Sequence, residues 1–208
     1  MTILDFYMVR HGQSYGQLLV DGTELDRLPA SRRPPGIETG LMEDDWRLSP
    51  LGQRQAVLLG ERLAQTPFDL IFHSPLERAR ATAQAVIDRQ TRPVPVHIVR
   101  DLMEIGDYGD ETQQEIYARA QRAIAAIREQ SPFGACILVA AHGGINNRLL
   151  MALLGLPALE TPFWRFGQDN TGLSRVIISD ENPTRLCCMN DLSHLTAEVR
   201  METMGGYR

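Results

Sequence analysis

The chain has 208 residues, of which 43% are hydrophobic and 23% are charged, and these are ordinary values for a globular protein. The formal net charge of -5 argues against a nucleic-acid-binding surface, although a local cluster of arginines can still bind a small anion. No signal peptide precedes the first apolar segment, and no apolar run reaches the ~18 residues of a membrane span. We therefore expect a cytoplasmic protein with neither a nucleic-acid nor a membrane partner.

The three cysteines, Cys136, Cys187 and Cys188, have neither the number nor the spacing of a disulfide framework or a zinc site. All three lie in apolar runs, where a buried, reduced thiol is the usual state of a cysteine. The sequence thus predicts buried free thiols. It contains no cluster of ligands that indicates a metal, and we expect no cofactor.

The first predicted strand, residues 3–9, is mostly apolar and ends directly in Arg10-His11-Gly12. Such a strand is typical of the centre of a sheet that is covered on both faces. In open α/β sheets, ligands bind at the carboxyl ends of the strands. A permanent cation and an imidazole at this position suggest that His11 is a nucleophile that accepts a phosphoryl group, and that Arg10 helps to hold it.

Residues 18–47 form a long irregular stretch that is rich in glycine, proline and mixed charges. A loop of about 30 residues is unusual in a compact domain and is often a lid or a binding loop when it is ordered. The stretch is therefore either a lid over the active site or a disordered excursion. Its basic pair, Arg32-Arg33, either contacts a second anionic group of the substrate or faces solvent.

Ser49-Pro50 predicts the start of a helix, with serine as the N-cap and proline in the first turn. A second strand is predicted at residues 69–73. Ser74 and Glu77 then have the spacing of a capping box, which places Arg78 in the first turn of the next helix. If this helix begins at the carboxyl edge of the sheet, its N-terminus favours an anion there. The alternative is an exposed Arg78 that pairs with Glu77 or another neighbour.

The fourth predicted strand, residues 136–141, ends like the first one, in His142-Gly143-Gly144. Both ends lie on the same edge of a parallel sheet, so the two histidines can converge. A glycine after each histidine allows backbone N–H groups to approach a ligand, because no Cβ obstructs them. One histidine at a strand end is usually structural, but two such ends favour a shared site.

The remaining segments complete an alternation of strands and helices. They are a strand at 94–99, a helix that begins with a capping box of Thr112 and Glu115, a helix at 145–153, and two strands at 175–179 and 185–189 joined by a hairpin. This alternation predicts an α/β fold, a three-layer α/β/α sandwich around a mostly parallel sheet. We expect one domain over residues 1–208, with residues 18–47 as an insertion.

Arg10-His11-Gly12-Gln13-Ser14 resembles the R-H-G-[EQ]-[ST] signature of the histidine phosphatase superfamily, which has the phosphoglycerate-mutase-like fold. Further segments resemble motifs of that family and follow in the family's order; they are residues 48–56, 74–83, 102–104, 139–144, 170–172 and 190–195. Together the motifs extend over nearly the whole chain. On these motifs the chain is identified as a small, phosphatase-type member.

The resemblance implies a role for each matching residue. His11 Nε2 would attack phosphorus and form a phosphohistidine, and Glu104 would protonate the leaving oxygen and then deprotonate water. The phosphate oxygens would be bound by Arg10, Arg78, His142 and Gly143. Guanidinium groups suit this task because they bind phosphate bidentately. A nucleophilic histidine must be neutral at the attacking nitrogen, so we expect a backbone carbonyl to hold its Nδ1–H.

Two departures from the family pattern leave alternatives open. Gln17 stands where small members often have asparagine, and its amide either reaches the phosphate or points to solvent. The segment between Glu104 and the next helix is short, whereas the first loop is long. Other carboxyl groups therefore compete with Glu104 for the role of the acid; they are Asp107, Asp110, Glu111, Glu43 and Asp44.

The predicted activity is metal-independent hydrolysis of a small phosphomonoester. A phosphotransferase of the mutase type is a second interpretation, but a mutase must exclude water from the phosphoenzyme, and the short segment after Glu104 argues against that. An inactive module that binds a phosphorylated ligand is a third, disfavoured because every expected catalytic residue type is present. The substrate and the oligomeric state do not follow from the sequence.

Overall fold

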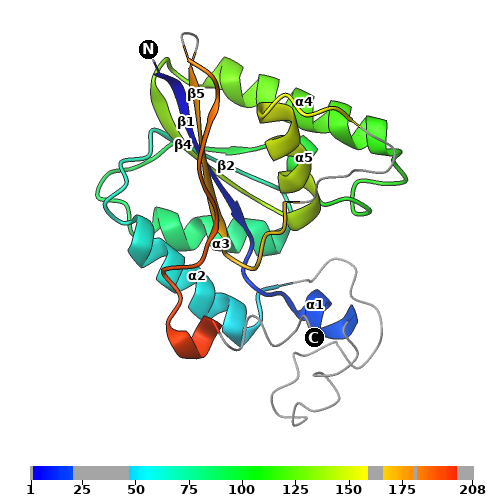
Figure 1. Cartoon of the computed structure of the whole chain (residues 1–208). Coiled ribbons are helices and arrows are strands. Elements are labelled where there is room, and N and C mark those ends of the chain that lie inside the picture. Colours follow the sequence, from blue (N-terminus) through cyan, green and yellow to red (C-terminus); the bar gives the residue numbers. More distant parts are fainter. Residues whose placement is uncertain (1, 21–46, 159–165, 180–181, 201–208) are drawn as a thin grey trace.

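The computed structural model describes residues 2–20, 47–158, 166–179 and 182–200. Six strands form one sheet in the order β3-β2-β4-β1-β5-β6. Figure 1 labels β1, β2, β4 and β5 of this sheet. The strands are β1 (Thr2–Arg10), β2 (Leu70–His73), β3 (Val96–Ile98), β4 (Ala135–Ala141), β5 (Leu173–Ser179) and β6 (Arg185–Asp191). The helices are α1 (Tyr15–Val20), α2 (Pro50–Leu63), α3 (Glu77–Ile87), α4 (Gln113–Gln130) and α5 (Gly143–Leu153), with a 3-10 turn, η3, at Arg100–Leu102.

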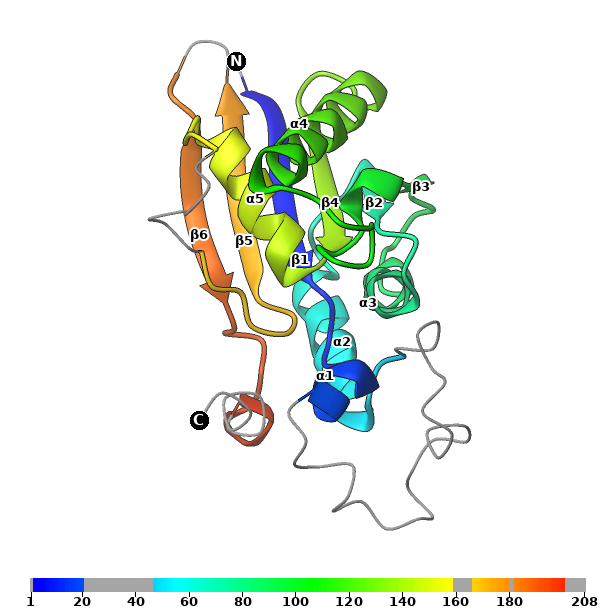
Figure 2. The same ribbon diagram turned by 90° about the vertical axis from the view of Figure 1, so that its right-hand side faces the viewer.

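The prediction of a mostly parallel sheet is confirmed. β1, β4, β2 and β3 pair in parallel, whereas β5 and β6 add to β1 as antiparallel strands. Figure 2 shows β5 and β6 at one edge of the sheet and β2 and β3 at the other. The carboxyl ends of β1, β2 and β4 therefore lie side by side, which brings the segments that follow them to one edge.

Helices cover both faces of the sheet, as the predicted three-layer sandwich requires. Alternate residues of β1 point to opposite faces, so Phe6 and Met8 pack with α4 and α5, while Val9 packs with α2 and α3. All three side chains are fully buried. The sheet is thus apolar on both faces, which explains why the central strands are continuous hydrophobic runs.

Two of the three predicted helix caps are confirmed. Ser49 Oγ accepts a 3.0 Å hydrogen bond from Gly52 N at the start of α2, and Thr112 and Glu115 form a reciprocal capping box at the start of α4. The predicted capping box of Ser74 and Glu77 is wrong. Leu76 is the N-cap of α3 and has no side-chain cap; the Ser74 hydroxyl accepts from Leu76 N at 3.3 Å and contacts His142 across the sheet edge.

Two further expectations are corrected. Helix α1 falls partly in the stretch predicted to be irregular from residue 18; with six residues, it is too short to show a periodic apolar pattern. Cys187 is exposed rather than buried, because β6 is an edge strand, while Cys136 and Cys188 are partly buried; all three are free thiols.

Several predictions fall outside the described residues or stay untested. Most of the 18–47 insertion, with Arg32, Arg33, Glu43 and Asp44, lies outside the described part of the chain. That residues 1–208 form one domain stays a prediction. Among the helices that the structure describes, none is long and apolar enough to cross a membrane.

Candidate active site

The two histidines that follow β1 and β4 lie next to each other. Arg10 is paired with Ala141 in the parallel ladder, and His11 N donates a 3.0 Å hydrogen bond to Ala141 O. His142 then follows β4 as the N-cap of α5. The centroids of the His11 and His142 rings are 5.0 Å apart, with the planes tilted by 59°. The parallel pairing of β1 with β4 is therefore what brings the two imidazoles together.

His11 is buried, and one of its ring nitrogens is held by the backbone. Nδ1 lies 2.7 Å from Gly12 O, and this contact is a hydrogen bond when Nδ1 carries the proton. That tautomer leaves the lone pair on Nε2. Burial lowers the pKa of His11 well below 6.5, and the charges of Arg10 and Arg78 lower it further. The imidazole is therefore neutral at neutral pH, as a nucleophile must be.

Buried polar side chains fix the backbone on one side of His11. Gly12 N donates to Thr82 Oγ1 at 3.0 Å, and Thr82 Oγ1 donates to Arg78 O at 2.7 Å. Gln13 N donates to Gln55 Oε1 at 2.8 Å. Thr82 and Gln55 were not among the predicted site residues, although both lie inside segments that resemble family motifs, and that was the available signal. They act on the backbone of the site rather than on a ligand.

A second group of residues holds the same backbone from the β5 side. Thr171 N donates to Arg10 O at 3.0 Å, and Asn170 Nδ2 donates to His11 O at 2.9 Å. Asn170 Nδ2 also donates to Gln17 Oε1 at 2.9 Å, and the same oxygen accepts from Ser14 N at 3.1 Å. Gln17 thus lies beside His11, and its carbonyl oxygen and its amide nitrogen, which donates to Asn170 Oδ1 at 3.3 Å, are both used in local contacts. Its role as a phosphate ligand stays a prediction.

The guanidinium groups of Arg10 and Arg78 both lie near enough to His11 for their charges to lower its pKa. Arg10 Nη1 donates to Gln168 O at 2.7 Å, and Arg10 packs against the first residue of α5, where a Cβ on Gly143 would lie 3.4 Å from Arg10 Nε. Arg78, in the first turn of α3, is buried and forms a 2.5 Å ion pair with the partly exposed Asp107. The alternative pairing of Arg78 with Glu77 does not occur, because Glu77 binds Arg80 instead.

His142 is completely buried at the start of α5. Its Nε2 lies 2.8 Å from Ser74 Oγ, and its Nδ1 makes no hydrogen bond to any residue that the structure describes. Burial lowers the pKa of His142 well below 6.5, and the nearby His11, Arg78 and Arg10 act in the same direction. His142 is therefore a neutral imidazole beside His11, and one of its buried ring nitrogens has no hydrogen-bond partner among the described residues.

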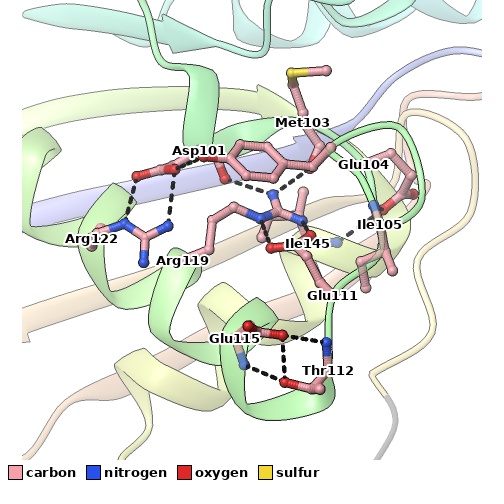
Figure 3. A network of polar contacts seen from close by, with 11 residues as sticks. Asp101, Met103, Glu104, Ile105, Glu111, Thr112, Glu115, Arg119, Arg122 and Ile145 are labelled. Carbon is pink, nitrogen blue, oxygen red and sulfur yellow. Dashed lines mark hydrogen bonds and ion pairs between the residues drawn. The ribbon is translucent and has the colours of Figure 1, made fainter.

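Glu104 is fixed at the N-terminus of α5 by three backbone donors. Its Oε1 accepts from Ile105 N at 2.8 Å and from Ile145 N at 3.1 Å, and its Oε2 accepts from Gly144 N at 3.1 Å. Figure 3 shows Glu104 with Ile105 and Ile145 around it. A Cβ on Gly144 would lie only 2.5 Å from Glu104 Oε1, so a larger residue there would force the carboxyl to shift. His142 and Glu104 are thus held at one helix terminus.

The other carboxyl groups that compete with Glu104 for the role of the acid differ in their contacts and exposure. Glu111 forms a bidentate ion pair with the buried Arg119, so it is committed to the core. Asp110 is exposed. Asp107 lies on Arg78 and so remains close to the proposed phosphate site. Within the described ranges, no three His, Cys, Asp or Glu side chains are grouped to hold a metal ion.

Comparison with known proteins places these observations in a family. The sequence pattern of the histidine phosphatase superfamily (branch 1) matches residues 6–110 and 106–191. A glucosyl-3-phosphoglycerate phosphatase from Mycolicibacterium vanbaalenii is 32% identical over 196 residues, covering 78% of this chain and 79% of that protein. Phosphoserine phosphatase 1 from Hydrogenobacter thermophilus is 26% identical, covering 78% and 88%. The crystal structure of an alpha-ribazole phosphatase from Shigella flexneri superimposes with a TM-score of 0.66 at 25% identity, covering 90% of this chain and 96% of that one.

Proposed function

The chain belongs to the histidine phosphatase superfamily, and we propose that it hydrolyses phosphomonoesters of small molecules through a phosphohistidine on His11. The observation that carries this proposal is the state of His11. Its Nδ1 is held 2.7 Å from Gly12 O, and its pKa is lowered by burial and by two guanidinium groups. Nε2 is therefore unprotonated, beside cations that attract a phosphate dianion.

In the first step, His11 Nε2 bonds to phosphorus while the bond from phosphorus to the leaving oxygen breaks. Arg10 and Arg78 bind the non-bridging oxygens, and His142 and the N–H of Gly143 support them. Fixed positive charge of this kind supplies most of the rate in phosphoryl transfer, since the transition state spreads negative charge over those oxygens. Glu104 gives its proton to the leaving oxygen, so the alcohol departs neutral.

In the second step, the Glu104 carboxylate accepts a proton from water as the water oxygen bonds to phosphorus. The bond from phosphorus to His11 Nε2 then breaks, and inorganic phosphate and the free imidazole are regenerated. Glu104 suits both steps because its position is fixed by backbone donors at the α5 terminus, independently of the substrate. The cycle needs no group beyond the side chains of this site, which supports a metal-independent reaction.

Most of the relatives favour hydrolysis over phosphoryl retention, although a 2,3-bisphosphoglycerate-dependent phosphoglycerate mutase from Bartonella bacilliformis is also 24% identical to this chain. The proteins from Mycolicibacterium, Hydrogenobacter and Shigella are named as phosphatases of small phosphorylated metabolites. We therefore place this chain among enzymes that release phosphate from a small phosphorylated substrate. No contact among the described residues favours the mutase interpretation or an inactive binding module.

The test is turnover of p-nitrophenyl phosphate with and without a chelator, combined with trapping of the phosphoenzyme. The wild-type protein should be active and insensitive to EDTA, and it should carry an acid-labile phosphate detectable by 31P NMR or mass spectrometry. His11→Asn should abolish both the activity and the label. His97→Asn, which changes a histidine stacked on Phe72 away from the site, is the matched control and should keep both. Turnover by His11→Asn, or loss of activity in EDTA, would refute the mechanism.

A further inference from the structure

Arg119, on α4, is among the largest fully buried side chains in the described part of the protein, and it is not one of the residues proposed to bind phosphate. Burying a guanidinium is costly unless its charge and its N–H groups are satisfied. Arg119 Nε and Nη2 donate to the two oxygens of Glu111 at 2.7 and 2.6 Å. Arg119 Nη1 donates to Met103 O at 2.7 Å and to Asp101 O at 3.0 Å. Such complete pairing of a buried charge indicates a specific role for Arg119.

The partners of Arg119 all belong to residues 101–111, the segment that carries Glu104. Asp101 and Met103 precede Glu104, whereas Glu111 follows it and ends the segment. The guanidinium carbon also lies 4.3 Å from the ring centroid of Tyr108, in the middle of the segment. Figure 3 shows the Arg119 side chain reaching across to both arms of this loop. The Arg119 side chain thus binds the segment near both of its ends.

Besides Arg119, side chains of the segment itself support its shape: Glu104 binds the N-terminus of α5, Asp107 pairs with Arg78, and Tyr108 Oη donates to Asp101 Oδ1. No backbone–backbone hydrogen bond joins residues 104–111 to the described remainder of the chain. Gly106 and Gly109 have φ values of 92° and 126°, in the region that favours glycine, so the backbone reverses sharply there. The short link between η3 and α4 is therefore held by side chains rather than by secondary structure, and Arg119 makes the largest share of those contacts.

We propose that Arg119 is a positioning residue for the chemical step, which holds the 101–111 segment so that Glu104 meets the leaving oxygen. This inference rests on the proposed function, because it assigns to Arg119 the geometry of the acid in that reaction. Substitution of Arg119 removes the donors that bind Met103 O, next to Glu104, and the Glu111 carboxylate at the end of the segment. The Glu104 carboxyl then samples positions away from the N-terminus of α5. A displacement of about 1 Å can reduce a rate about 100-fold.

A purely structural role for Arg119 and a positioning role predict different kinetics. General damage to the site lowers kcat/KM for every substrate by the same factor. A displaced acid lowers kcat/KM mainly for esters whose alcohol leaves poorly, because a good leaving group departs without a proton. The decisive quantity is therefore the ratio of kcat/KM for p-nitrophenyl phosphate to kcat/KM for an alkyl phosphate such as glycerol 3-phosphate.

Arg119→Gln should raise this ratio about 10-fold or more, toward the ratio of Glu104→Gln, where the acid itself is removed. Arg122→Gln is the matched control, because Arg122 lies on the same helix and binds the Asp101 carboxylate at the surface. Its ratio should equal that of the wild-type protein. Arg119→Lys, which keeps the charge but not the fork of donors, should restore the ratio only in part.

Folding of each variant is verified by circular dichroism and thermal melting. If Arg119→Gln does not fold, Glu111→Gln is used in its place. This variant removes the carboxylate that binds Arg119 at the end of the segment, and it should also raise the ratio. In a Glu104→Gln background, Arg119→Gln should leave the ratio unchanged, since no acid remains to be displaced. Equal losses of kcat/KM for both substrates, which leave the ratio unchanged, would overturn the positioning role. Wild-type kcat/KM for both substrates in Arg119→Gln would overturn it as well. Failure of the proposed function is distinct, because then the wild-type protein itself is inactive or His11→Asn is active.

Discussion

The backbone N–H of Gly12 donates a 3.0 Å hydrogen bond to the hydroxyl of Thr82, a residue 70 positions away on the buried face of α3. The same hydroxyl donates to Arg78 O at 2.7 Å, one helical turn earlier. A single side chain therefore connects the residue after His11, the proposed nucleophile, to Arg78, which carries the second guanidinium proposed to bind phosphate. The distance between His11 and Arg78 is set by this bridge and by the packing of α3 on the sheet.

Thr82→Val should weaken both stability and catalysis. Valine fills the same volume but leaves the buried Gly12 N–H without an acceptor, which costs about 1–3 kcal/mol of the free energy of unfolding. Urea unfolding gives this loss, and kcat/KM should fall as the Gly12 backbone moves. Thr82→Ser keeps the hydroxyl and serves as the control. Equal behaviour of the valine and serine variants would show that the bridge does not matter.

The acid should be Glu104 rather than Asp107. Removing a general acid typically costs about 10²–10⁴-fold, so Glu104→Gln should lose that much kcat/KM with an alkyl phosphate and far less with p-nitrophenyl phosphate. Asp107→Asn removes a carboxylate from Arg78 and should instead strengthen competitive inhibition by inorganic phosphate, since one anion no longer competes for the guanidinium. The opposite pattern, with the leaving-group effect in Asp107→Asn, would move the acid to Asp107.

Gly144→Ala should disturb Glu104 directly. The added Cβ would lie 2.5 Å from Glu104 Oε1 and 2.8 Å from Ile105 Cδ1, so the carboxyl has to shift. Alanine is otherwise favourable in a helix, and α5 should therefore remain folded. We expect kcat/KM for an alkyl phosphate to fall about 10-fold or more. Gly167→Ala is the control, because among the described residues, its chain neighbours aside, no atom lies within 4 Å of its added Cβ. Wild-type activity in Gly144→Ala would argue against a fixed Glu104.

The nucleophile should remain neutral in mildly acidic solution. Burial and the adjacent arginines lower the pKa of His11 well below 6.5, so its protonation should not limit kcat/KM at pH 6.5. NMR spectra of protein with 15N-labelled histidine can follow the ring nitrogens, and the His11 signals are assigned by their absence in His11→Asn. Titration of these signals at or above pH 6.5 would contradict the placement of the ring.

Stability should fall as the pH drops from about 6.5 toward 4. Burial lowers the pKa of His194 to about 4, and His11 and His142 are also lowered, so the unfolded chain binds more protons than the folded one in this window. The contribution is complete above pH 6.5 and is lost progressively below it. Each histidine adds at most about 1.4 kcal/mol per pH unit to the slope of the free energy of unfolding.

His194→Gln removes the contribution of His194 to the slope of the free energy of unfolding against pH. Glutamine can still donate to Thr171 Oγ1, which lies 3.0 Å from His194 Nε2, but it does not titrate. Urea unfolding between pH 4 and 8 should give a shallower dependence of the free energy of unfolding on pH for this variant below about pH 6.5, and parallel curves for the wild-type protein and the variant above about pH 7. Identical slopes would show that His194 is not protonated more readily in the unfolded chain.

Local features of this protein were determined by the sequence alone. The continuous apolar runs of β1 and β4 predicted central strands, and the order of strands and helices predicted the three layers. Ser49 and Thr112 were recognised as caps because a cap is formed with residues two or three positions away. His11 and His142 were found because each directly ends a strand, and parallel strands end at one edge of the sheet.

The contacts that join distant segments were decided only by the tertiary structure. Ser74 has the spacing of a helix cap, yet its hydroxyl faces His142, which lies near it only because β2 pairs with β4. Arg119 has the appearance of an ordinary helix-surface arginine, and no local pattern predicts its burial against Glu111. Strand pairing and helix packing choose these partners, because a polar group removed from water must bind whatever donor or acceptor the fold brings within reach.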